Sequence, residues 1–367
     1  MAKGVCIVSS TFPPDIGGPA TFTYNFCKWV HKSGENLRVV TYASIKKIDD
    51  ETLSVSRVYV NEFMISRIIR MVWRILRAGR GSKYYFATGA FIETYFASTI
   101  SKKKTVVKIP GDIVWERARN NGLTDLDIEE FQDSKKPIKY SIFRFLFLQS
   151  VKSATSVIVP SIYLFNLVKK WGVADDRIHI VHNSIADEYF ISPELNSHEY
   201  DVLTVARLVP WKGVSEIIEV CAYLNLRLCI VGDGPERRNL QKIAEELSAD
   251  VDFLGQIDST KMPGIYQKSK IFVLNSYYEG LPHTLVEARA SGVFSIARSG
   301  TGSTEVITDG EDGYLIGGEN QFSLREALSK SLADPRFREN AITKAQLDCR
   351  KRFDQETSFK QIREIIQ

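Results

Sequence analysis

Two glutamates, Glu279 and Glu287, stand with seven residues between them on a segment that contains a Gly-Leu-Pro turn. A strand pattern ends just before this segment and an apolar helical pattern follows it, so Pro282 is expected at the start of a helix. One carboxylate then lies on the turn, and the other lies about one turn into the helix. Carboxylates accept hydrogen bonds from sugar hydroxyls, and the free backbone N–H groups between them suit a diphosphate. The alternative interpretation is a solvated helix start.

Two cations stand on a second segment of the same kind. Arg207 directly follows a strand pattern, and Lys212 comes five residues later, before the next helical pattern. A pair of cations on a strand-to-helix loop can hold the negative charges of a diphosphate. The alternative is that both are surface charges without a ligand.

Two pairs of glycines follow strand patterns, at positions where a loop could approach a ligand closely. Gly17 and Gly18 come after the first strand, where the alternative is a tight turn and nothing more. Gly232 and Gly234 lie in the run Val-Gly-Asp-Gly-Pro, which invites a dinucleotide-binding interpretation. Arg237 opposes it, because it occupies the position of the third glycine in that motif.

The elements that must position these residues alternate between short apolar strands and helices along the whole chain, which predicts parallel sheets covered by helices on both faces. The number of strands favours two Rossmann-like, doubly wound halves over one sheet. We expect a first domain over residues 1–187, a second over 188–352, a terminal helix over 353–367 that packs back on the first domain, and a binding cleft between the domains. The predicted strands are 4–9, 38–42, 84–87, 105–109, 156–159, 178–182, 201–205, 227–231, 251–254, 271–274 and 294–297.

The composition is that of an ordinary globular protein. The 367 residues are 44% hydrophobic and 25% charged, and the net charge of +4 is too small to argue for a nucleic-acid partner. Five scattered cysteines indicate a reduced, cytoplasmic protein. The sequence offers no membrane-spanning run and no signal peptide.

These motifs together resemble the retaining glycosyltransferases of the GT-B fold, glycosyltransferase family four, over nearly the whole chain. The resemblance lies in the Glu-x7-Glu spacing, the Arg207…Lys212-Gly segment and the Val-Gly-x-Gly-Pro turn, and residues 298–315 resemble the closing stretches of that family. It implies metal-independent sugar transfer without a cofactor, from a UDP- or GDP-sugar co-substrate to a glycan or lipid-linked acceptor of the cell surface. The residues that it assigns to donor binding are Gly17, Gly18, Arg207, Lys212, Gly232, Gly234, Gln256, Glu279, Gly280, Leu281, Pro282, His283, Thr284 and Glu287.

Four residues are assigned to catalysis by the same resemblance: Glu279, Arg207, Lys212 and Asp112. Asp112 stands in a Gly-Asp turn where many relatives carry a histidine close to the transferred sugar. It is expected to bond a sugar or acceptor hydroxyl, to cap the helix that follows, or to do both. A second acidic pair, Asp125 and Asp127, spells the Asp-x-Asp of metal-dependent enzymes, but its context favours an acidic helix start, and no metal site is predicted.

Rival functions on a similar fold are a sugar-nucleotide epimerase, a glycosyl phosphorylase and a non-catalytic donor-binding subunit. An epimerase would need no acceptor, a phosphorylase would need phosphate, and a non-catalytic subunit would bind the donor without turnover. Residues 67–80 and 135–147 are two basic, aromatic helical runs. They predict either docking to an anionic membrane surface, peripheral on its inner face, or core helices with a solvated arginine face.

Overall fold

The computed structural model describes residues 4–15, 18–44, 53–60, 63–191, 198–317 and 323–367. The chain forms two compact units, one comprising residues 1–181 and 359–367 and the other residues 182–358. Each unit has its own sheet, and both sheets are parallel throughout. In the described part of the chain, no helix combines the length and the apolarity needed to cross a membrane.

The first unit is built on a seven-stranded sheet in the order β3-β2-β1-β4-β5-β6-β7. Its central strands are fully buried, as expected for strands covered on both faces. The strands are β1 (Val5–Ser9), β2 (Leu37–Ala43), β3 (Val55–Tyr59), β4 (Tyr84–Ala87), β5 (Lys104–Lys108), β6 (Ser156–Val159) and β7 (Ile178–Ile180). The helices are α1 (Gly18–Lys32), α2 (Met64–Ala78), α3 (Phe91–Ser101), α4 (Ile113–Asn120), α5 (Ile128–Asp133), α6 (Ile138–Lys152) and α7 (Ile162–Lys170).

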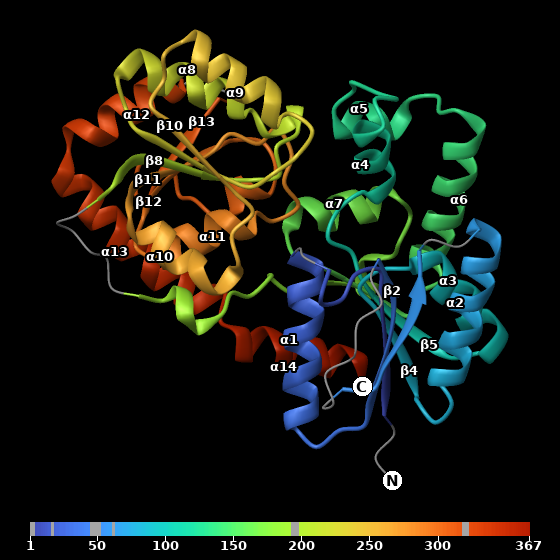
Figure 1. The fold of residues 1–367 in the computed structure, drawn as a ribbon. Helices are drawn as coiled ribbons and strands as arrows, with labels where there is room; N and C mark the ends of the chain where they lie inside the picture. The colour runs from blue at the N-terminus through green and yellow to red at the C-terminus, as the bar shows by residue number, and fades with distance from the viewer. Residues whose placement is uncertain (1–3, 16–17, 45–52, 61–62, 192–197, 318–322) are drawn as a thin grey trace. The chain divides into compact units, whose positions relative to one another are not determined.

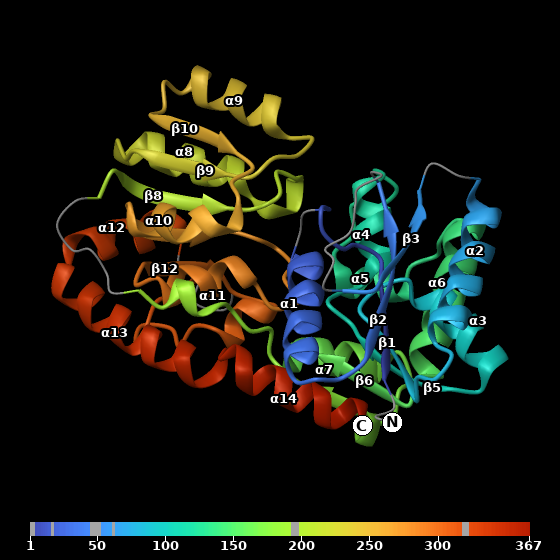
Figure 2. The same cartoon turned by 60° about the horizontal axis from the view of Figure 1, so that its bottom comes forward.

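Helices cover both faces of this sheet, with α1 on one face and α2, α3 and α6 on the other (Figures 1 and 2). The last helix, α14 (Gln355–Ile366), packs its second half beside α1. Its Phe359 is buried, and the ring meets those of Phe22, Phe26 and Trp29 at centroid distances of 5.3–5.9 Å. The end of the chain therefore completes the core of the unit in which the chain begins.

The second unit is built on a six-stranded sheet in the order β10-β9-β8-β11-β12-β13. The chain leaves β8 toward β9 on one side and returns to β11 on the other side, so the order of the strands reverses between β8 and β11. In such sheets, ligands bind outside the carboxyl ends of the strands at this switch point. The strands are β8 (Tyr200–Val205), β9 (Leu228–Val231), β10 (Val251–Gly255), β11 (Ser269–Leu274), β12 (Phe294–Arg298) and β13 (Tyr314–Ile316).

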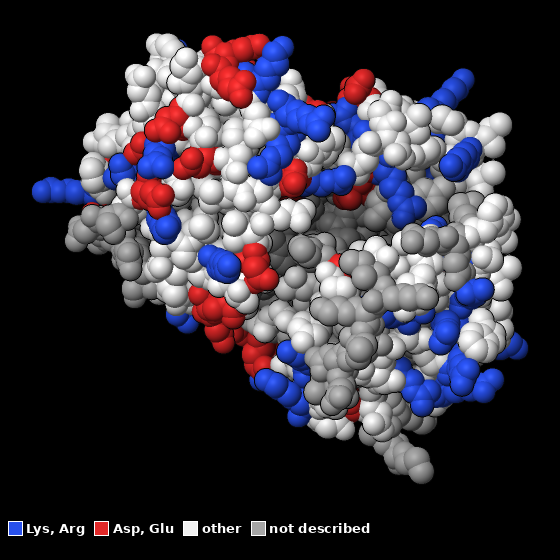
Figure 3. Space-filling model, viewed as in Figure 1, with Lys and Arg blue, Asp and Glu red and all other residues white. Residues whose placement is uncertain are grey.

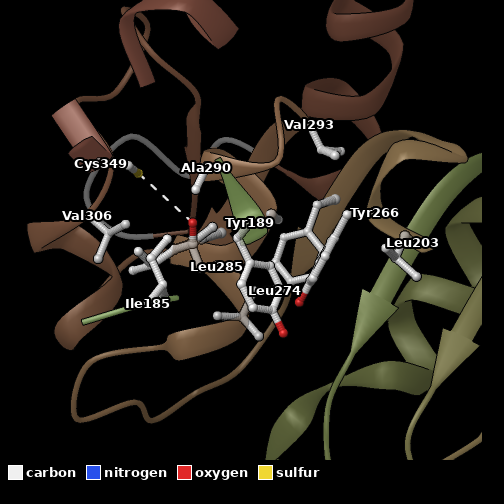
Figure 4. Packing of buried hydrophobic residues seen from close by; sticks show 14 of the residues in the cluster. Ile185, Tyr189, Leu203, Tyr266, Leu274, Leu285, Ala290, Val293, Val306 and Cys349 are labelled. Atoms are coloured by element: carbon white, nitrogen blue, oxygen red, sulfur yellow. Dashed lines mark hydrogen bonds between the residues drawn. The ribbon is translucent and has the colours of Figure 1, made fainter. Parts of the chain in front are cut away.

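Two hydrophobic cores, one on each face of this sheet, hold the second unit together. One joins the sheet to α8, α9 and α12, and the other joins it to α10, α11 and the end of α13. In the latter core the buried rings of Tyr189 and Tyr266 lie 6.1 Å apart, beside Leu285 of α11 (Figure 4). The helices are α8 (Val214–Leu224), α9 (Arg237–Glu246), α10 (Met262–Gln267), α11 (His283–Ala290), α12 (Leu324–Ala333) and α13 (Pro335–Arg352).

The predicted α/β architecture is confirmed, and each predicted strand overlaps a strand of the structure. Two strands were missed, β3 and β13. β3 is a sheet edge whose residues are mostly half-exposed, so that its polar Ser56 and Arg57 hide the strand pattern. The stretch from Asp309 to Leu315 makes a turn and then enters β13, which has only three residues and so gives little strand pattern.

Candidate functional site

A lysine–glutamate pair marks the switch point of the second unit. Lys212 ends the short 3-10 helix after β8 (Pro210–Lys212), and Glu279 lies on the loop after β11. The Lys212 Nζ and Glu279 Oε1 atoms are 2.5 Å apart, and both side chains are largely buried. An ammonium group has three N–H donors, so one can stay with Glu279 while the others reach a phosphate oxygen. The structure thus brings together two residues that the sequence places 67 positions apart.

The loop after β12 holds the backbone of Glu279 in place. The Glu279 N–H donates to the Thr301 hydroxyl, and the Glu279 carbonyl accepts from the Gly302 N–H, both at 2.9 Å. These two bonds hold the Glu279 backbone, and the ion pair with Lys212 holds its side chain. The predicted list of site residues omitted Thr301, although its stretch was noted as similar to the closing motifs of the family.

A partly buried polar network supports the Lys212 loop. Asn275, which follows β11 directly, donates to the Gly213 carbonyl at 2.9 Å and to Glu216 at 2.8 Å. Arg298, at the end of β12, donates to both Asn275 and Glu216. These residues support the loops and were missed by sequence reasoning. The available signal was their position, because polar side chains at the carboxyl ends of adjacent parallel strands meet at one edge.

Arg207 lies on the loop after β8, and its side chain is exposed. The predicted donor-site glycines Gly232 and Gly234 face this loop. A Cβ atom at Gly232 would stand 1.9 Å from the Ala206 carbonyl oxygen, and one at Gly234 would stand 2.2 Å from that of Leu208. These glycines therefore let the loop after β9 pack against the loop that carries Arg207. Their contact with a donor stays a prediction, as does that of the exposed Gln256 after β10.

Glu287 lies in the middle of α11, in surroundings unlike those of Glu279. Its Oε2 atom accepts a hydrogen bond of 2.9 Å from the hydroxyl of Tyr266, a fully buried residue of α10. Burial raises the pKa of the Glu287 carboxyl to about 7, and the hydrogen bond from Tyr266 acts in the opposite direction. Near neutral pH this carboxyl group therefore exists in both protonation states. Tyr266 is a partner that periodicity alone could not reveal.

Helix α11 begins at a proline turn and is held near its end by an ion pair. Pro282 occupies its N-cap position, which confirms the predicted turn and helix, and the helix then runs from His283 to Ala290. Of the other predicted residues, Gly280, Leu281 and Pro282 are buried, whereas His283 and Thr284 are half-buried at the helix start. Near its end, the fully buried Arg289 forms two bonds of 2.8 Å with Asp312, one to the carbonyl and one to the carboxylate.

Two predicted site residues of the first unit are described by the structure. Gly18 is the first residue of α1, whereas Gly17 lies outside the described residues. Asp112 is fully buried, and its Oδ1 atom accepts from the N–H groups of Val114 and Trp115 at the start of α4. The other oxygen accepts from the Gln132 amide at 3.0 Å and lies 3.5 Å from the Arg144 guanidinium.

These contacts confirm the predicted role of Asp112 as a helix N-cap, and they leave a contact with the sugar as a prediction. The acidic pair at 125 and 127 also has the predicted explanation. Asp127 caps α5 in a reciprocal capping box with Glu130. Among the residues that the structure describes, no three His, Cys, Asp or Glu side chains gather in a way that could hold a metal ion.

Comparisons with known proteins agree with this geometry. Residues 186–348, which include the whole candidate site of the second unit, match the family described as glycosyl transferases group 1. A Campylobacter jejuni relative is named as an alpha-1,4-N-acetyl-D-galactosaminyltransferase acting on a diNAcBac-PP-undecaprenol-linked sugar. It is 30% identical over 224 residues, which are 58% of this chain and 60% of the relative.

A GDP-mannose-dependent alpha-(1-6)-phosphatidylinositol monomannoside mannosyltransferase of Mycolicibacterium smegmatis is 31% identical over 149 residues, 37% of this chain and 39% of the relative. The chain thus aligns with less than two thirds of either protein. The crystal structure of Anabaena HepE with UDP-glucose superposes with a TM-score of 0.78 at 18% identity, covering 98% of both chains. The chain therefore has the GT-B fold with two Rossmann-like units, and its residues 186–348 are similar to the glycosyl transferases group 1.

Proposed function

We propose that this protein is a retaining glycosyltransferase that moves a sugar from a UDP- or GDP-sugar to a glycan or lipid-linked acceptor in the synthesis of cell-surface polysaccharide. The observation that carries the proposal is the Lys212–Glu279 pair at the switch point, with Glu287 on the helix that follows. The family match over residues 186–348 supports the reaction class. One relative is named as GDP-mannose-dependent, and one structural neighbour was crystallised with UDP-glucose. Both guanine and uracil are therefore kept as candidate bases of the donor.

In the proposed reaction, the bond between the sugar C1 and the diphosphate oxygen breaks, and a bond between C1 and the acceptor oxygen forms on the same face. The acceptor proton passes to an oxygen of the departing diphosphate. The main task of the protein is then to stabilise the negative charge that develops on that diphosphate. Lys212, the exposed Arg207 and the N–H groups at the start of α11 can supply this stabilisation without a metal ion.

The two glutamates take different parts of the donor in this proposal. Glu279 accepts hydrogen bonds from the transferred sugar and keeps the Lys212 ammonium beside the diphosphate. Glu287, in its ionised form, accepts hydrogen bonds from the hydroxyls of the ribose. All five cysteines are free and buried, which supports a reducing compartment. We propose that the reaction takes place in the cytoplasm, and that a lipid-linked acceptor would bring it to the inner face of the membrane.

A thermal-shift panel tests the proposal. UDP, GDP and ADP, with their common sugar conjugates, are added to the wild-type protein and to the Lys212→Ala variant. A ligand at a hundredfold excess over its dissociation constant stabilises the folded state by about 2.7 kcal/mol. We expect UDP or GDP to raise the melting temperature of the wild type clearly more than that of the variant. The proposal fails if no nucleoside diphosphate stabilises the wild type, or if the variant responds equally.

A further inference from the structure

Helix α2 exposes a row of large apolar side chains. Ile65, Ile69 and Trp73 recur at every fourth position and are 57%, 63% and 52% exposed. Residues four apart lie on the same side of a helix, so the three form one continuous row. The helix buries Met71 and Ile75 against the sheet, so the exposed row is additional to its core face. A helix that only packs on a sheet is normally polar on its outer side.

Neighbouring helices of the same layer also expose large apolar side chains. On α6, Ile138, Ile142 and Phe145 are 80%, 57% and 60% exposed, again at helical spacing. On α3, which packs against both α2 and α6, Ile100 is 66% exposed. The three helices lie side by side on the face of the sheet away from α1 (Figures 1 and 2). Extended exposed apolar patches are rare on monomeric proteins and mark sites of interaction.

Positive charge accompanies the apolar rows. Neither α2 nor α6 contains an acidic residue, and Arg70, Arg74, Arg77 and Lys139 are exposed on them. Figure 3 shows Lys and Arg side chains gathered over the part of the first unit that contains α2 and α3. The guanidinium groups of Arg74 and Arg77 lie 5.7 Å and 5.4 Å from the centre of the Trp73 ring. The one acidic residue of α3, Glu93, accepts a hydrogen bond from Tyr42.

We propose that this surface, which we call the basic apolar face, docks onto an anionic lipid bilayer. It is defined by Ile65, Ile69, Trp73, Ile100, Ile138, Ile142 and Phe145 together with Arg70, Arg74, Arg77 and Lys139. The apolar side chains enter the boundary between headgroups and acyl chains, Trp73 sits at the headgroup level, and the cations meet lipid phosphates. The expected attraction is about fivefold in affinity for each cation near the surface.

Charge also decides between a bilayer and a second copy of the chain. In a two-fold symmetric dimer the same patch lies on both sides of the interface. Arginines of α2 would then approach arginines of the partner, with no acidic residue on either α2 or α6 to compensate them. An anionic bilayer offers the complementary charge. The inference does not depend on the proposed sugar transfer, because docking needs neither donor nor acceptor.

Co-sedimentation with vesicles tests the inference on the full chain, using phosphatidylcholine vesicles with and without phosphatidylglycerol. We expect binding to the anionic vesicles only, and its loss at high salt, which screens the cations. The Ile69→Gln/Trp73→Gln/Ile142→Gln variant should abolish this binding. Its matched control, Tyr223→Gln/Leu347→Gln, removes apolar side chains that are 68% and 67% exposed on the second unit, and should bind as the wild type does.

A charge variant and its control separate the electrostatic contribution to membrane binding from the apolar contribution. Arg74→Gln/Arg77→Gln should weaken binding about tenfold or more, whereas Arg336→Gln/Lys351→Gln, which removes two exposed cations of α13, should not. Equal binding of all variants, or equal binding to neutral vesicles, would overturn the inference. Sedimentation velocity without lipid gives the third contrary outcome: a wild-type dimer that the triple apolar variant converts to monomer would assign the face to a second copy.

Discussion

The two glutamates of the Glu-x7-Glu segment differ in almost everything except residue type. Glu279 lies on a loop, pairs with a lysine at 2.5 Å, and has its backbone held by a neighbouring loop. Glu287 lies within a helix and bonds a buried tyrosine, and burial raises its pKa to about 7. Identical carboxyl groups are thus prepared for different tasks by their surroundings. Glu279 is suited to hold a cation and a sugar, and Glu287 is suited to accept hydrogen bonds from neutral hydroxyl groups.

The two regions also contain two ion pairs of different kinds. Arg289 and Asp312, which fasten the helix of Glu287, are 0% and 9% exposed, whereas Lys212 and Glu279 are 17% and 15% exposed and lie at the strand edge. The first pair joins two parts of the core, and the second is placed where a ligand can reach it. We therefore expect loss of the first to affect folding and loss of the second to affect activity.

The largest expected effect on stability comes from Arg289→Ala. The change leaves the Asp312 carboxylate buried without its cation, which destabilises a protein by about 3–5 kcal/mol. Urea unfolding measures the difference, with Arg336→Ala, at an exposed position of α13, as the control. A loss below about 1 kcal/mol would show that the pair does not fasten α11.

Lys212→Ala should have the opposite profile. Removal of one group that stabilises charge in the transition state lowers kcat by about 10²–10³-fold. The loss of folding stability should be smaller than that of Arg289→Ala, because the Lys212 and Glu279 side chains are 17% and 15% exposed and the carboxylate left behind can reach water. Sugar transfer from the donor found in the thermal-shift panel measures the first quantity, and urea unfolding measures the second. The control is Lys242→Ala, which removes an exposed lysine paired with Glu246. Full transfer activity in Lys212→Ala would contradict the assignment.

Glu287→Gln should change how stability depends on pH. Burial raises the pKa of this carboxyl from 4.5 to about 7, so between these values the folded protein keeps a proton that the unfolded chain has lost. Stability of the wild type therefore falls as pH rises through this window, and glutamine removes that loss. Relative to the wild type, the variant should gain stability as the pH rises from about 4.5 to about 7. Glu339→Gln, at an exposed position, should show no such trend.

The smallest effect is expected from Tyr266→Phe. The Tyr266 hydroxyl lowers the pKa of Glu287, so its removal should raise that pKa further. A hydrogen bond contributes about 1 kcal/mol, which corresponds to roughly 0.7 pH units. If ionised Glu287 accepts hydrogen bonds from the ribose hydroxyls, protonation of Glu287 at low pH weakens nucleotide binding. In Tyr266→Phe, the pH at which half of this affinity is lost should rise by about this amount.

The matched control for Tyr266→Phe is Tyr189→Phe. Tyr189 belongs to the same hydrophobic core as Tyr266, but its hydroxyl donates a hydrogen bond to the Ser259 carbonyl and not to Glu287. A general loss of packing would lower nucleotide affinity without moving the midpoint. An unchanged midpoint in Tyr266→Phe would therefore break the proposed link between the tyrosine and the carboxylate.

Much of the fold could be predicted from the sequence, because buried parallel strands are continuous apolar runs. β4 and β6 were predicted at their observed bounds for this reason. The edge strand β3 escaped because its residues are mostly half-exposed and include polar side chains, and β13 escaped because it has only three residues beside a turn. Local composition cannot show that a short or polar segment will find a partner in the sheet.

The charged residues of the candidate site were predictable from the sequence, and the residues that support them were less so. Lys212 and Glu279 were identified by their positions after strands, and the structure joins them. Asn275, Thr301 and Tyr266 were not identified, because their roles depend on contacts between elements far apart in the sequence. For the same reason, sequence reasoning left two roles open for Asp112, and its cap role emerged from the fold.

The central claim is that a nucleoside diphosphate binds at the switch point beside Lys212. The most direct test is calorimetric titration of UDP and of GDP into the wild-type protein and into Lys212→Ala. The account predicts that one of the two nucleotides binds the wild type, and that the variant binds it at least about tenfold more weakly, a difference of about 1.4 kcal/mol. Equal affinity in both proteins, or no binding of either nucleotide to the wild type, would contradict it.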